Sequence, residues 1–238
     1  MRTIVPCKCT DWEVLWICCK KFPSIIKLIF FDKILGDPWS YRNIKEMMLE
    51  RGVEVDHSTI NRWVLKYTPE IEKKFRKYKN PVGRSWRMDE TYIKIKGKWN
   101  YLYRAIDKEG RTVDFLLTAK RDRKAAKRFF KKAIKTNGTP EKINIDKSGA
   151  NTAGIKDYNA DKGTNIEIRQ YKYLNNRVES DHRKVKHITK PMMGFQSFNS
   201  ARKVLAGIEM VAMLRKGQSN YMPLFVKNSV EAFYELAQ

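Results

Sequence analysis

The spacing of apolar residues changes near residue 84, and this change divides the sequence into a helical part and a mixed part. From Ser40 onward, apolar positions recur every three or four residues, which predicts one helix over 41–50 and a second from about 56 to 67. Gly52 lies between them, where a helix end favours glycine. A further, very basic helix is predicted over 68–79, and residues 80–84 form a predicted linker.

After this linker the pattern is typical of strands separated by Gly-containing turns. The predicted elements are strands 85–95, 99–106 and 111–119, helix 122–135 capped by Asp122, strand 142–146, a weak helix over 151–158, strand 166–173, and helices 176–188 and 197–216. This order predicts an α/β, ribonuclease-H-like domain with a mixed five-stranded sheet, preceded by a small all-α domain.

The same patterns predict how the chain is organised into regions. These are an atypical N-terminal segment 1–38, a helix-turn-helix DNA-binding domain 39–79, the linker 80–84, a ribonuclease-H-like domain 85–217, and a C-terminal helical tail 218–238. An ordinary helical hairpin remains the alternative for the helix-turn-helix.

The net charge of the chain indicates which kind of molecule it binds. The 238 residues include 49 Lys and Arg but only 26 Asp and Glu, a net charge of +23. Such a charge favours a polyanion, with DNA or RNA ahead of a membrane surface. The apolar stretch 22–35 contains Lys27 and Asp32 and is too short to span a bilayer. We therefore expect a cytoplasmic, nucleic-acid-binding protein with no membrane association.

The four cysteines all lie near the start of the chain, at Cys7, Cys9, Cys18 and Cys19. The rest of the chain has none, which excludes a disulfide-stapled scaffold. Adjacent Cys18 and Cys19 suit a tetrahedral zinc site poorly, so free thiols are expected.

Two groups of side chains are predicted to contact DNA. The second helix of the helix-turn-helix offers side chains that reach base edges or phosphates, and the helix over 122–135 offers a basic face that holds phosphates without reading sequence. The predicted residues are His57, Thr59, Asn61, Arg62 and Lys66 in the first group, and Arg123, Lys127 and Lys131 in the second.

Three acidic residues are placed where metal chemistry needs them. Asp89 lies in the first strand, Asp146 ends the fourth, and Glu179 lies early in a helix. The first and fourth strands are neighbours in this fold, so their carboxylates converge, and carboxylates are the ligands that Mg²⁺ prefers. Any one acid alone is more often a surface partner of a Lys or Arg than a metal ligand, and it is the three together that point to a metal site. Glu90 is expected on the opposite strand face from Asp89, and Asp181 about 200° around the helix from Glu179, so both are expected to lie outside the site.

Several longer motifs, spread over about residues 40–217, are similar to those of a known protein family. They are Ser40–Tyr41–Arg42, the run 56–64, Trp86–Arg87–Met88–Asp89–Glu90–Thr91–Tyr92, Asp146–Lys147–Ser148–Gly149–Ala150–Asn151, and the run 176–186. In these the chain resembles the DDE transposases of bacterial insertion sequences, specifically the insertion-sequence-six family.

The resemblance implies a fold, an activity and roles for single residues. Asp89, Asp146 and Glu179 would be the metal ligands for two Mg²⁺ ions, with Mn²⁺ able to substitute. Lys186, seven residues after Glu179, is the family's basic position, and Arg183 shares its helix face. The expected partners are double-stranded DNA, as inverted-repeat ends and target, and further copies of the chain in a homodimer or larger assembly. The expected location is the bacterial cytoplasm, associated with the nucleoid.

Two features depart from the family pattern. The 32 residues between Asp146 and Glu179 make a slightly shorter connection than is usual in the family, a change that costs little. Residues 1–38 do not resemble the family's start, which indicates an altered N-terminus. The alternative reading is therefore a catalytically inactive or truncated transposase remnant that only binds DNA. A structure-specific nuclease of the same fold is a further rival, although that class usually lacks a helix-turn-helix.

Overall fold

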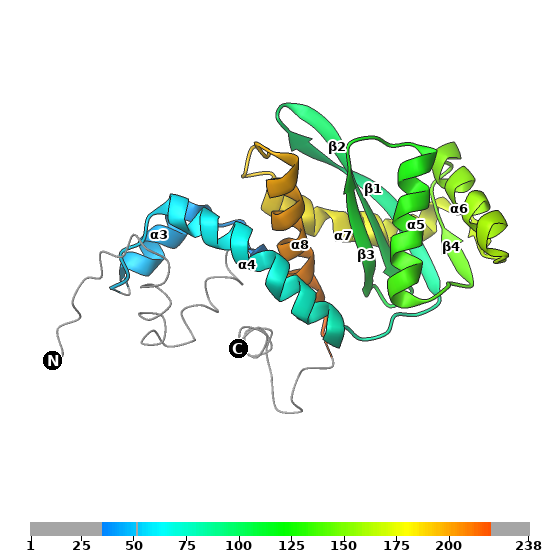
Figure 1. The fold of residues 1–238 in the computed structure, drawn as a ribbon, viewed down its shortest axis with the longest axis horizontal. Helices are drawn as coiled ribbons and strands as arrows, with labels where there is room; N and C mark the ends of the chain where they lie inside the picture. The colour runs from blue at the N-terminus through cyan, green and yellow to red at the C-terminus, as the bar shows by residue number, and fades with distance from the viewer. Residues whose placement is uncertain (1–34, 51, 220–238) are drawn as a thin grey trace. The chain divides into compact units, whose positions relative to one another are not determined.

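The computed structural model describes residues 35–50 and 52–219. The cysteines, most of the atypical N-terminal segment and nearly all of the predicted C-terminal tail lie outside these residues. The described chain forms two compact units, one from residues 35–79 and 203–219 and the other from residues 80–202 (Figure 1). Within the described ranges, no helix combines the length and apolar character that crossing a bilayer requires.

The first unit contains helices α3 (Tyr41–Glu50) and α4 (His57–Tyr78) and most of α8 (Phe198–Arg215). The apolar positions that predict α3 are buried, namely Ile44, Met47 and Met48. Gly52 follows α3 with a φ of +75°, a left-handed conformation that glycine adopts without strain. Asp56 then caps α4, because its carboxylate accepts a hydrogen bond from the Ser58 backbone N–H at 2.9 Å.

Helix α4 is one continuous helix of 22 residues, so the prediction of a separate helix over 68–79 was wrong. Its buried residues, Ile60, Val64, Thr68, Ile71 and Phe75, form a single stripe that runs past Pro69. Pro69 removes one hydrogen bond from the helix, but burial along the whole stripe outweighs that local cost. Gly207 of α8 lets α4 approach closely, since a Cβ there would lie 2.8 Å from Thr68 Cγ2.

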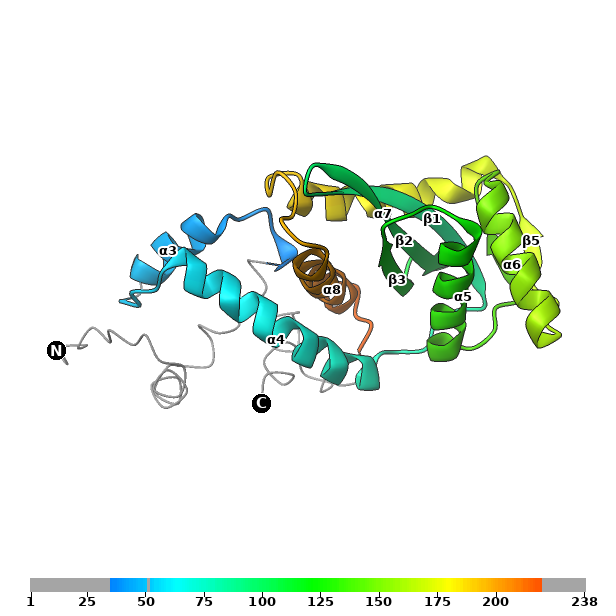
Figure 2. The ribbon, with the colours of Figure 1, turned by 45° about the horizontal axis from the view of Figure 1, so that its top comes forward.

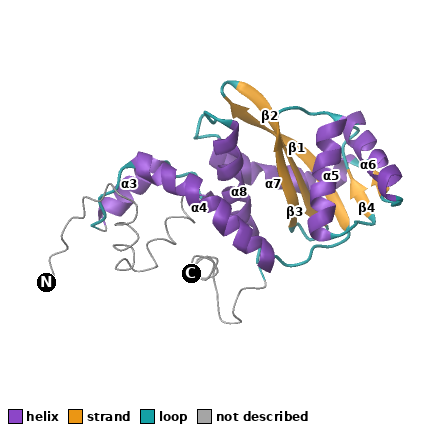
Figure 3. Cartoon of the chain, viewed as in Figure 1, coloured by secondary structure: helices purple, strands orange, loops and turns teal. Residues whose placement is uncertain are grey.

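The second unit is built on a five-stranded mixed sheet (Figures 1 and 3). The strands are β1 (Ser85–Ile95), β2 (Lys98–Asp107), β3 (Thr112–Thr118), β4 (Lys142–Asn144) and β5 (Glu167–Arg169), in the order β3-β2-β1-β4-β5. The pairs β1–β2 and β2–β3 are antiparallel, while β1–β4 and β4–β5 are parallel. This topology confirms the predicted ribonuclease-H-like fold class.

Helices cover both faces of this sheet (Figure 2). Helix α5 (Arg123–Asn137) packs Ala126, Phe129 and Phe130 against Met88 of β1 and Tyr103 of β2. Helix α6 (Gly149–Lys162) packs against α5. Helix α7 (Lys172–Thr189) lies on the opposite face, against β1 and β2. Asp122 caps α5 as predicted, with its carboxylate accepting the Ala125 N–H at 2.7 Å.

The segment before α7 differs from its prediction. Strand β5 ends at Arg169 rather than near residue 173, and α7 begins at Lys172 rather than near residue 176. The Asn144 side chain explains this, because its Oδ1 accepts the Tyr171 N–H and its Nδ2 donates to the Tyr171 carbonyl, each at 3.1 Å. This amide occupies the backbone groups of Tyr171 that a longer strand would use.

Gly154 is required for the close contact between α6 and α5. A Cβ at this position would lie 2.8 Å from Ala126 Cβ and 3.1 Å from the Lys127 backbone nitrogen. We expect Gly154→Ala to lower the free energy of unfolding by about 1–3 kcal/mol, because the two helices must separate. Gly149→Ala is the matched control, since no atom lies within 4 Å of a Cβ there. Urea unfolding of both variants measures this, and equal stability would contradict the packing role.

Candidate active site

An open edge of β1 brings two of the predicted acids together. Strand β4 pairs with β1 only along Ser85–Arg87, so among the described residues no strand pairs with that edge of β1 between Arg87 and the bridge from Ile95 to Phe195. Asp89 and Glu90 lie on this free stretch, and Asp146 lies two residues past the end of β4. One carboxylate oxygen from each of Asp89, Glu90 and Asp146 lies within 4.8 Å of the others.

The expectation that Glu90 lies outside the site was wrong. Its side chain does leave the opposite face of β1 from Asp89, as strand alternation requires. No β4 residue pairs with this stretch of β1, however, and a carboxylate oxygen of Glu90 lies within 4.8 Å of one from Asp89 and one from Asp146. The Glu90 side chain is only 4% exposed. Burial raises its pKa, with Arg121 acting in the opposite direction.

Arg121 is the cation that holds two of these carboxylates in the described structure. It precedes α5, and its Nη2 donates to Asp146 Oδ2 at 2.8 Å while its Nε donates to Glu90 Oε1 at 3.2 Å. Asp146 also accepts the Ser148 backbone N–H at 3.2 Å and the Asn151 side-chain amide at 3.3 Å. These donors fix the Asp146 carboxylate at the N-terminus of α6.

The electrostatics of Asp89 are those of a crowded acidic site. The pKa of Asp89 is raised to about 7, mainly by burial and also by the nearby charges of Glu90, Asp146 and Glu179. The charge of Glu179, on α7, is the smallest of these contributions. A divalent cation bound here would stabilise the ionised form of Asp89. It would also offset the repulsion between the neighbouring carboxylates.

Helix α7 is attached to the sheet by a buried ion pair next to Asp89. Arg104 of β2 is the direct cross-strand partner of Asp89, and its Nη2 donates to Asp181 Oδ2 at 2.7 Å. Asp181 is therefore buried in an ion pair, and it lies outside the group of carboxylates formed by Asp89, Glu90 and Asp146. Neighbouring His182 places its Nδ1 3.7 Å from Asp89 Oδ2. Burial, with Arg104 and Lys186, lowers the pKa of His182 to about 3, so its imidazole is neutral.

The remaining predicted residues of α7 are exposed. Glu179 is not one of the three acids whose carboxylate oxygens lie within 4.8 Å of one another. It is exposed, and it lies three residues before His182, on the same side of α7. Lys186 is exposed one turn beyond His182, and its charge contributes to the lowered pKa of His182. Arg183 is also exposed. The structure thus brings Asp89 and Asp146 together, adds Glu90, and leaves Glu179 within electrostatic reach.

The predicted DNA-binding residues of α5 differ in their surroundings. Arg123 forms an ion pair with Asp157 of α6, and Lys127 Nζ lies 2.6 Å from Asp161 Oδ2. Lys131 is exposed, with no acidic partner among the described residues. Two of these three cations therefore connect α5 to α6 in the described structure.

On α4, His57, Arg62 and Lys66 are exposed, while Thr59 and Asn61 are half-buried. Arg62 Nη2 donates to Thr59 Oγ1 at 2.9 Å, and His57 Nδ1 lies 3.1 Å from Asp56 Oδ1. Lys66 Nζ lies 5.7 Å from the centre of the Tyr67 ring. The exposed cations leave this end of α4 accessible to a ligand.

Sequence reasoning missed Arg121, Arg104 and the contribution of Glu90. Arg121 has no motif of its own, since it is one basic residue in a basic segment. The cross-strand partnership of Arg104 with Asp89 follows from hairpin register, which the Lys96–Gly97 turn determines.

The fold and this cluster define a class of protein. A ribonuclease-H-like sheet with a group of oxygen ligands at the edge of its central strand suits divalent cations, because hard cations prefer carboxylates. The close oxygens and the raised pKa of Asp89 fit such a cation. This is the arrangement of metal-dependent enzymes that act on phosphodiesters.

Comparison with known proteins identifies the family. The model of a DDE domain matches residues 83–218. The chain is 43% identical over 207 residues to the transposase for insertion sequence-like element IS431mec of Staphylococcus aureus, covering 87% of this chain and 91% of that protein. It is 42% identical over 207 residues, with the same coverage, to the transposase for insertion sequence element IS257 in transposon Tn4003 of Staphylococcus aureus. The chain belongs to the DDE transposases of the insertion-sequence-six family.

Among solved structures, the chain is similar to the HTLV-2 integrase catalytic core domain in complex with magnesium, in its trimeric form. That match has 17% sequence identity and a TM-score of 0.45, and it covers 64% of this chain and 97% of the other.

Proposed function

We propose that this protein is a transposase that binds the terminal inverted repeats of its own insertion sequence and catalyses strand cleavage and strand transfer. The observation that carries the proposal is the meeting of Asp89, Glu90 and Asp146 at the open edge of β1, in a chain that belongs to the DDE transposases. The charge of +23 supports a polyanionic substrate.

Asp89, Asp146 and Glu179 are the proposed ligands of two Mg²⁺ ions, for which Mn²⁺ substitutes. Such ions, when bound, activate a nucleophile and stabilise the leaving oxygen of a phosphodiester. The protein side chains orient this site. Arg121 and the Ser148 N–H hold the Asp146 carboxylate, and the Arg104–Asp181 pair holds α7 beside Asp89.

The exposed cations of α7 are proposed to hold the DNA backbone. Arg183 lies about one turn and Lys186 about two turns beyond Glu179, so phosphates bound by them lie about 6 and 10 Å along α7 from the proposed metal site. His182 stays neutral and contributes no charge to this contact. The exposed residues of α4 are proposed to read the inverted repeat, and Lys131 of α5 to contact phosphates.

The proposal extends to assembly and location. Two element ends must be held together for strand transfer, which favours a homodimer or a larger assembly on DNA. The proposed location is the bacterial cytoplasm, associated with the nucleoid, where the substrate DNA lies.

The direct test uses the DNA that flanks the reading frame as the source of the element ends. The purified full chain is incubated with a duplex carrying one such end, first with Mg²⁺ and then with EDTA. We expect a nick at the element end with Mg²⁺ only. A chain that binds the end in both conditions but cuts in neither is a DNA-binding remnant rather than an active transposase.

Recognition of the inverted repeat depends on the exposed end of α4. We expect Arg62→Ala to weaken binding to the element end by about 1–3 kcal/mol, the value of an arginine contact to a guanine edge. Binding to a random duplex should change much less. Titrations of both duplexes at equal salt measure the difference, and Glu70→Ala, an exposed change elsewhere on α4, is the control. Equal losses on both duplexes would assign Arg62 to a phosphate contact instead.

A further inference from the structure

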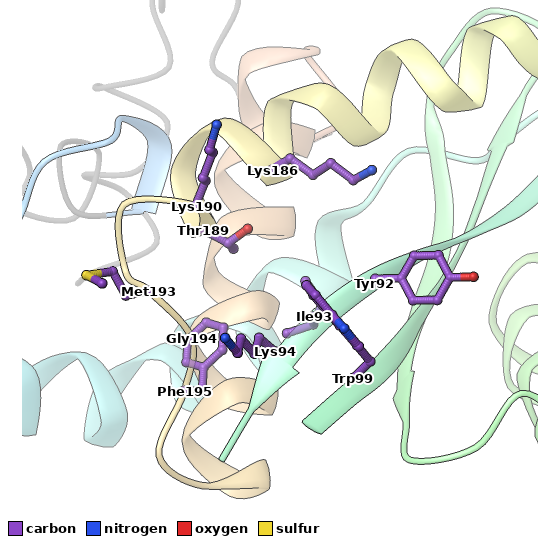
Figure 4. A pocket seen from close by; sticks show the side chains of 10 residues that line it. All are labelled: Tyr92, Ile93, Lys94, Trp99, Lys186, Thr189, Lys190, Met193, Gly194 and Phe195. Atoms are coloured by element: carbon purple, nitrogen blue, oxygen red, sulfur yellow. The ribbon is translucent and has the colours of Figure 1, made fainter. Parts of the chain in front are cut away.

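A pocket of about 640 Å³ lies at the far end of β1 from its pairing with β4 (Figure 4). Its walls come from the β1–β2 hairpin, the C-terminal end of α7 and the loop that follows α7. That loop is joined to the open edge of β1, because the Phe195 N–H donates to the Lys94 carbonyl at 2.9 Å and the Lys96 N–H donates to the Phe195 carbonyl at 2.8 Å. The size is typical of pockets that hold small ligands or parts of larger ones.

Two large aromatic side chains line this pocket without being buried. Tyr92 is 51% exposed and Trp99 is 61% exposed, with ring centres 6.2 Å apart in an edge-to-face arrangement. The β1–β2 register pairs Tyr92 with Tyr101 and Lys94 with Trp99, so all four side chains leave the same face of the hairpin. Exposed aromatic rings that are held by a sheet form a surface on which flat rings stack.

The charges around these rings are all positive. Lys94, Lys186 and Lys190 line the pocket, and none of them has an acidic partner among the described residues. In Figure 4, Lys186 and Lys190 extend from α7, while Trp99 and Lys94 come from the hairpin. None of the described residues that line the pocket is acidic. Aromatic rings combined with unpaired cations match a ligand that has a flat ring and a phosphate, which describes a nucleotide of DNA.

The pocket lies at a defined spacing from the carboxylate cluster. Tyr92 is three residues from Asp89 along β1, about 10 Å at the rise of a strand. Lys186 is seven residues from Glu179 along α7, also about 10 Å at the rise of a helix. Successive phosphates are spaced by at least about 3.4 Å, the axial rise in duplex DNA, so the pocket lies no more than about three nucleotides from a phosphate at the carboxylates.

We propose that this pocket holds an unpaired nucleobase of the DNA strand, within about three nucleotides of the phosphate that is cleaved, with the base stacked on Trp99 and Tyr92 and its phosphates beside Lys186 and Lys190. This inference rests on the proposed function, because it describes how the DNA substrate of the proposed transposase is held. It predicts that DNA whose strands separate near the end binds better than a fully paired end.

The test compares two short duplexes in EDTA, one with flush ends and one with an unpaired tail of about three nucleotides that contains 2-aminopurine. Wild type is expected to bind the tailed duplex about 5- to 100-fold more tightly than the flush duplex, and to quench the 2-aminopurine. In Trp99→Ala this preference and the quenching should disappear, whereas Trp99→Phe should retain most of both. Tyr173→Ala, which removes a 67% exposed ring at the other end of α7, should leave both unchanged.

The outcomes separate this inference from the function on which it rests. Binding of both duplexes with no preference for the tail overturns the pocket assignment alone. A preference that survives Trp99→Ala, in protein whose thermal melting matches wild type, also overturns it. Failure of wild type to bind either duplex overturns both the pocket assignment and the proposed function.

Discussion

Replacing Asp89 or Asp146 with Asn, or Glu179 with Gln, is expected to slow strand cleavage by about 1,000-fold or more. The physical reason is that a divalent cation at this site contributes several kcal/mol to the transition state, and each factor of ten in rate corresponds to about 1.4 kcal/mol. DNA binding should persist, because each substitution removes a negative charge from the surface that faces phosphate. Single-turnover cleavage of the element end, alongside a binding titration, measures both quantities.

The matched control for these variants is Asp161→Asn, which changes an exposed carboxylate of α6 that pairs with Lys127. It should retain most activity. Glu90→Gln identifies the third ligand, since Glu90 is the acid that lies within 4.8 Å of both aspartates. A dead Glu90 variant together with an active Glu179 variant would transfer the third ligand role from Glu179 to Glu90.

Asp89→Asn has a second expected effect that does not depend on activity. The pKa of Asp89 is about 7 in the folded protein against an ordinary value of 3.8, so the folded state favours the protonated form. The contribution of this carboxyl to stability is therefore full at low pH and is lost as the pH rises through 7. In EDTA at pH 8 we expect Asp89→Asn to raise the free energy of unfolding by on the order of 2–4 kcal/mol. At pH 4 the difference should vanish.

Local signals explain why the central sheet could be predicted from the sequence. Positive φ angles at Gly97 and Gly110 allow the two tight turns on either side of β2, and the strands that these turns join are rich in β-branched and aromatic residues. Asp122 predicts the start of α5, because a carboxylate before a helix accepts hydrogen bonds from its free N–H groups. Each of these features depends on residues that are close together in the sequence.

The predictions were wrong where contacts between residues distant in the sequence determine where an element ends or which side chains meet. The buried stripe of α4 carries the helix past Pro69, and the Asn144 amide ends β5 early through Tyr171. The Glu90 error has the same origin. Strand alternation correctly places its side chain opposite Asp89, but the length of β4 decides whether the two side chains can meet around the strand. That length is a property of the sheet, and no short motif encodes it.

The Arg104–Asp181 pair gives the largest expected effect on stability. Arg104 is 1% exposed and Asp181 is 8% exposed at the side chain, and both come from elements that also carry or face Asp89. Asp181→Ala removes the carboxylate opposite a buried guanidinium, and breaking such a pair typically costs about 3–5 kcal/mol. In a chain of this size we expect melting to fall by about 6–20 °C. Cleavage should also be lost, because α7 then no longer holds Glu179 and His182 beside Asp89.

Two further variants test whether the loss of stability comes from the ion pair itself or from any substitution on α7. Lys184→Ala removes an exposed partner whose Nζ lies 3.8 Å from Asp181 Oδ1, and it should cost less than about 1 kcal/mol. The double variant Arg104→Met with Asp181→Leu replaces both charges by apolar side chains, and it should recover most of the stability that Asp181→Ala loses. Circular dichroism melting of wild type, Arg104→Met, Asp181→Leu and the double variant measures the cycle, and Asp181→Ala and Lys184→Ala are melted alongside. If the double variant is as unstable as the sum of its single changes, the pair does not act as a unit, and the attachment of α7 must depend on other contacts.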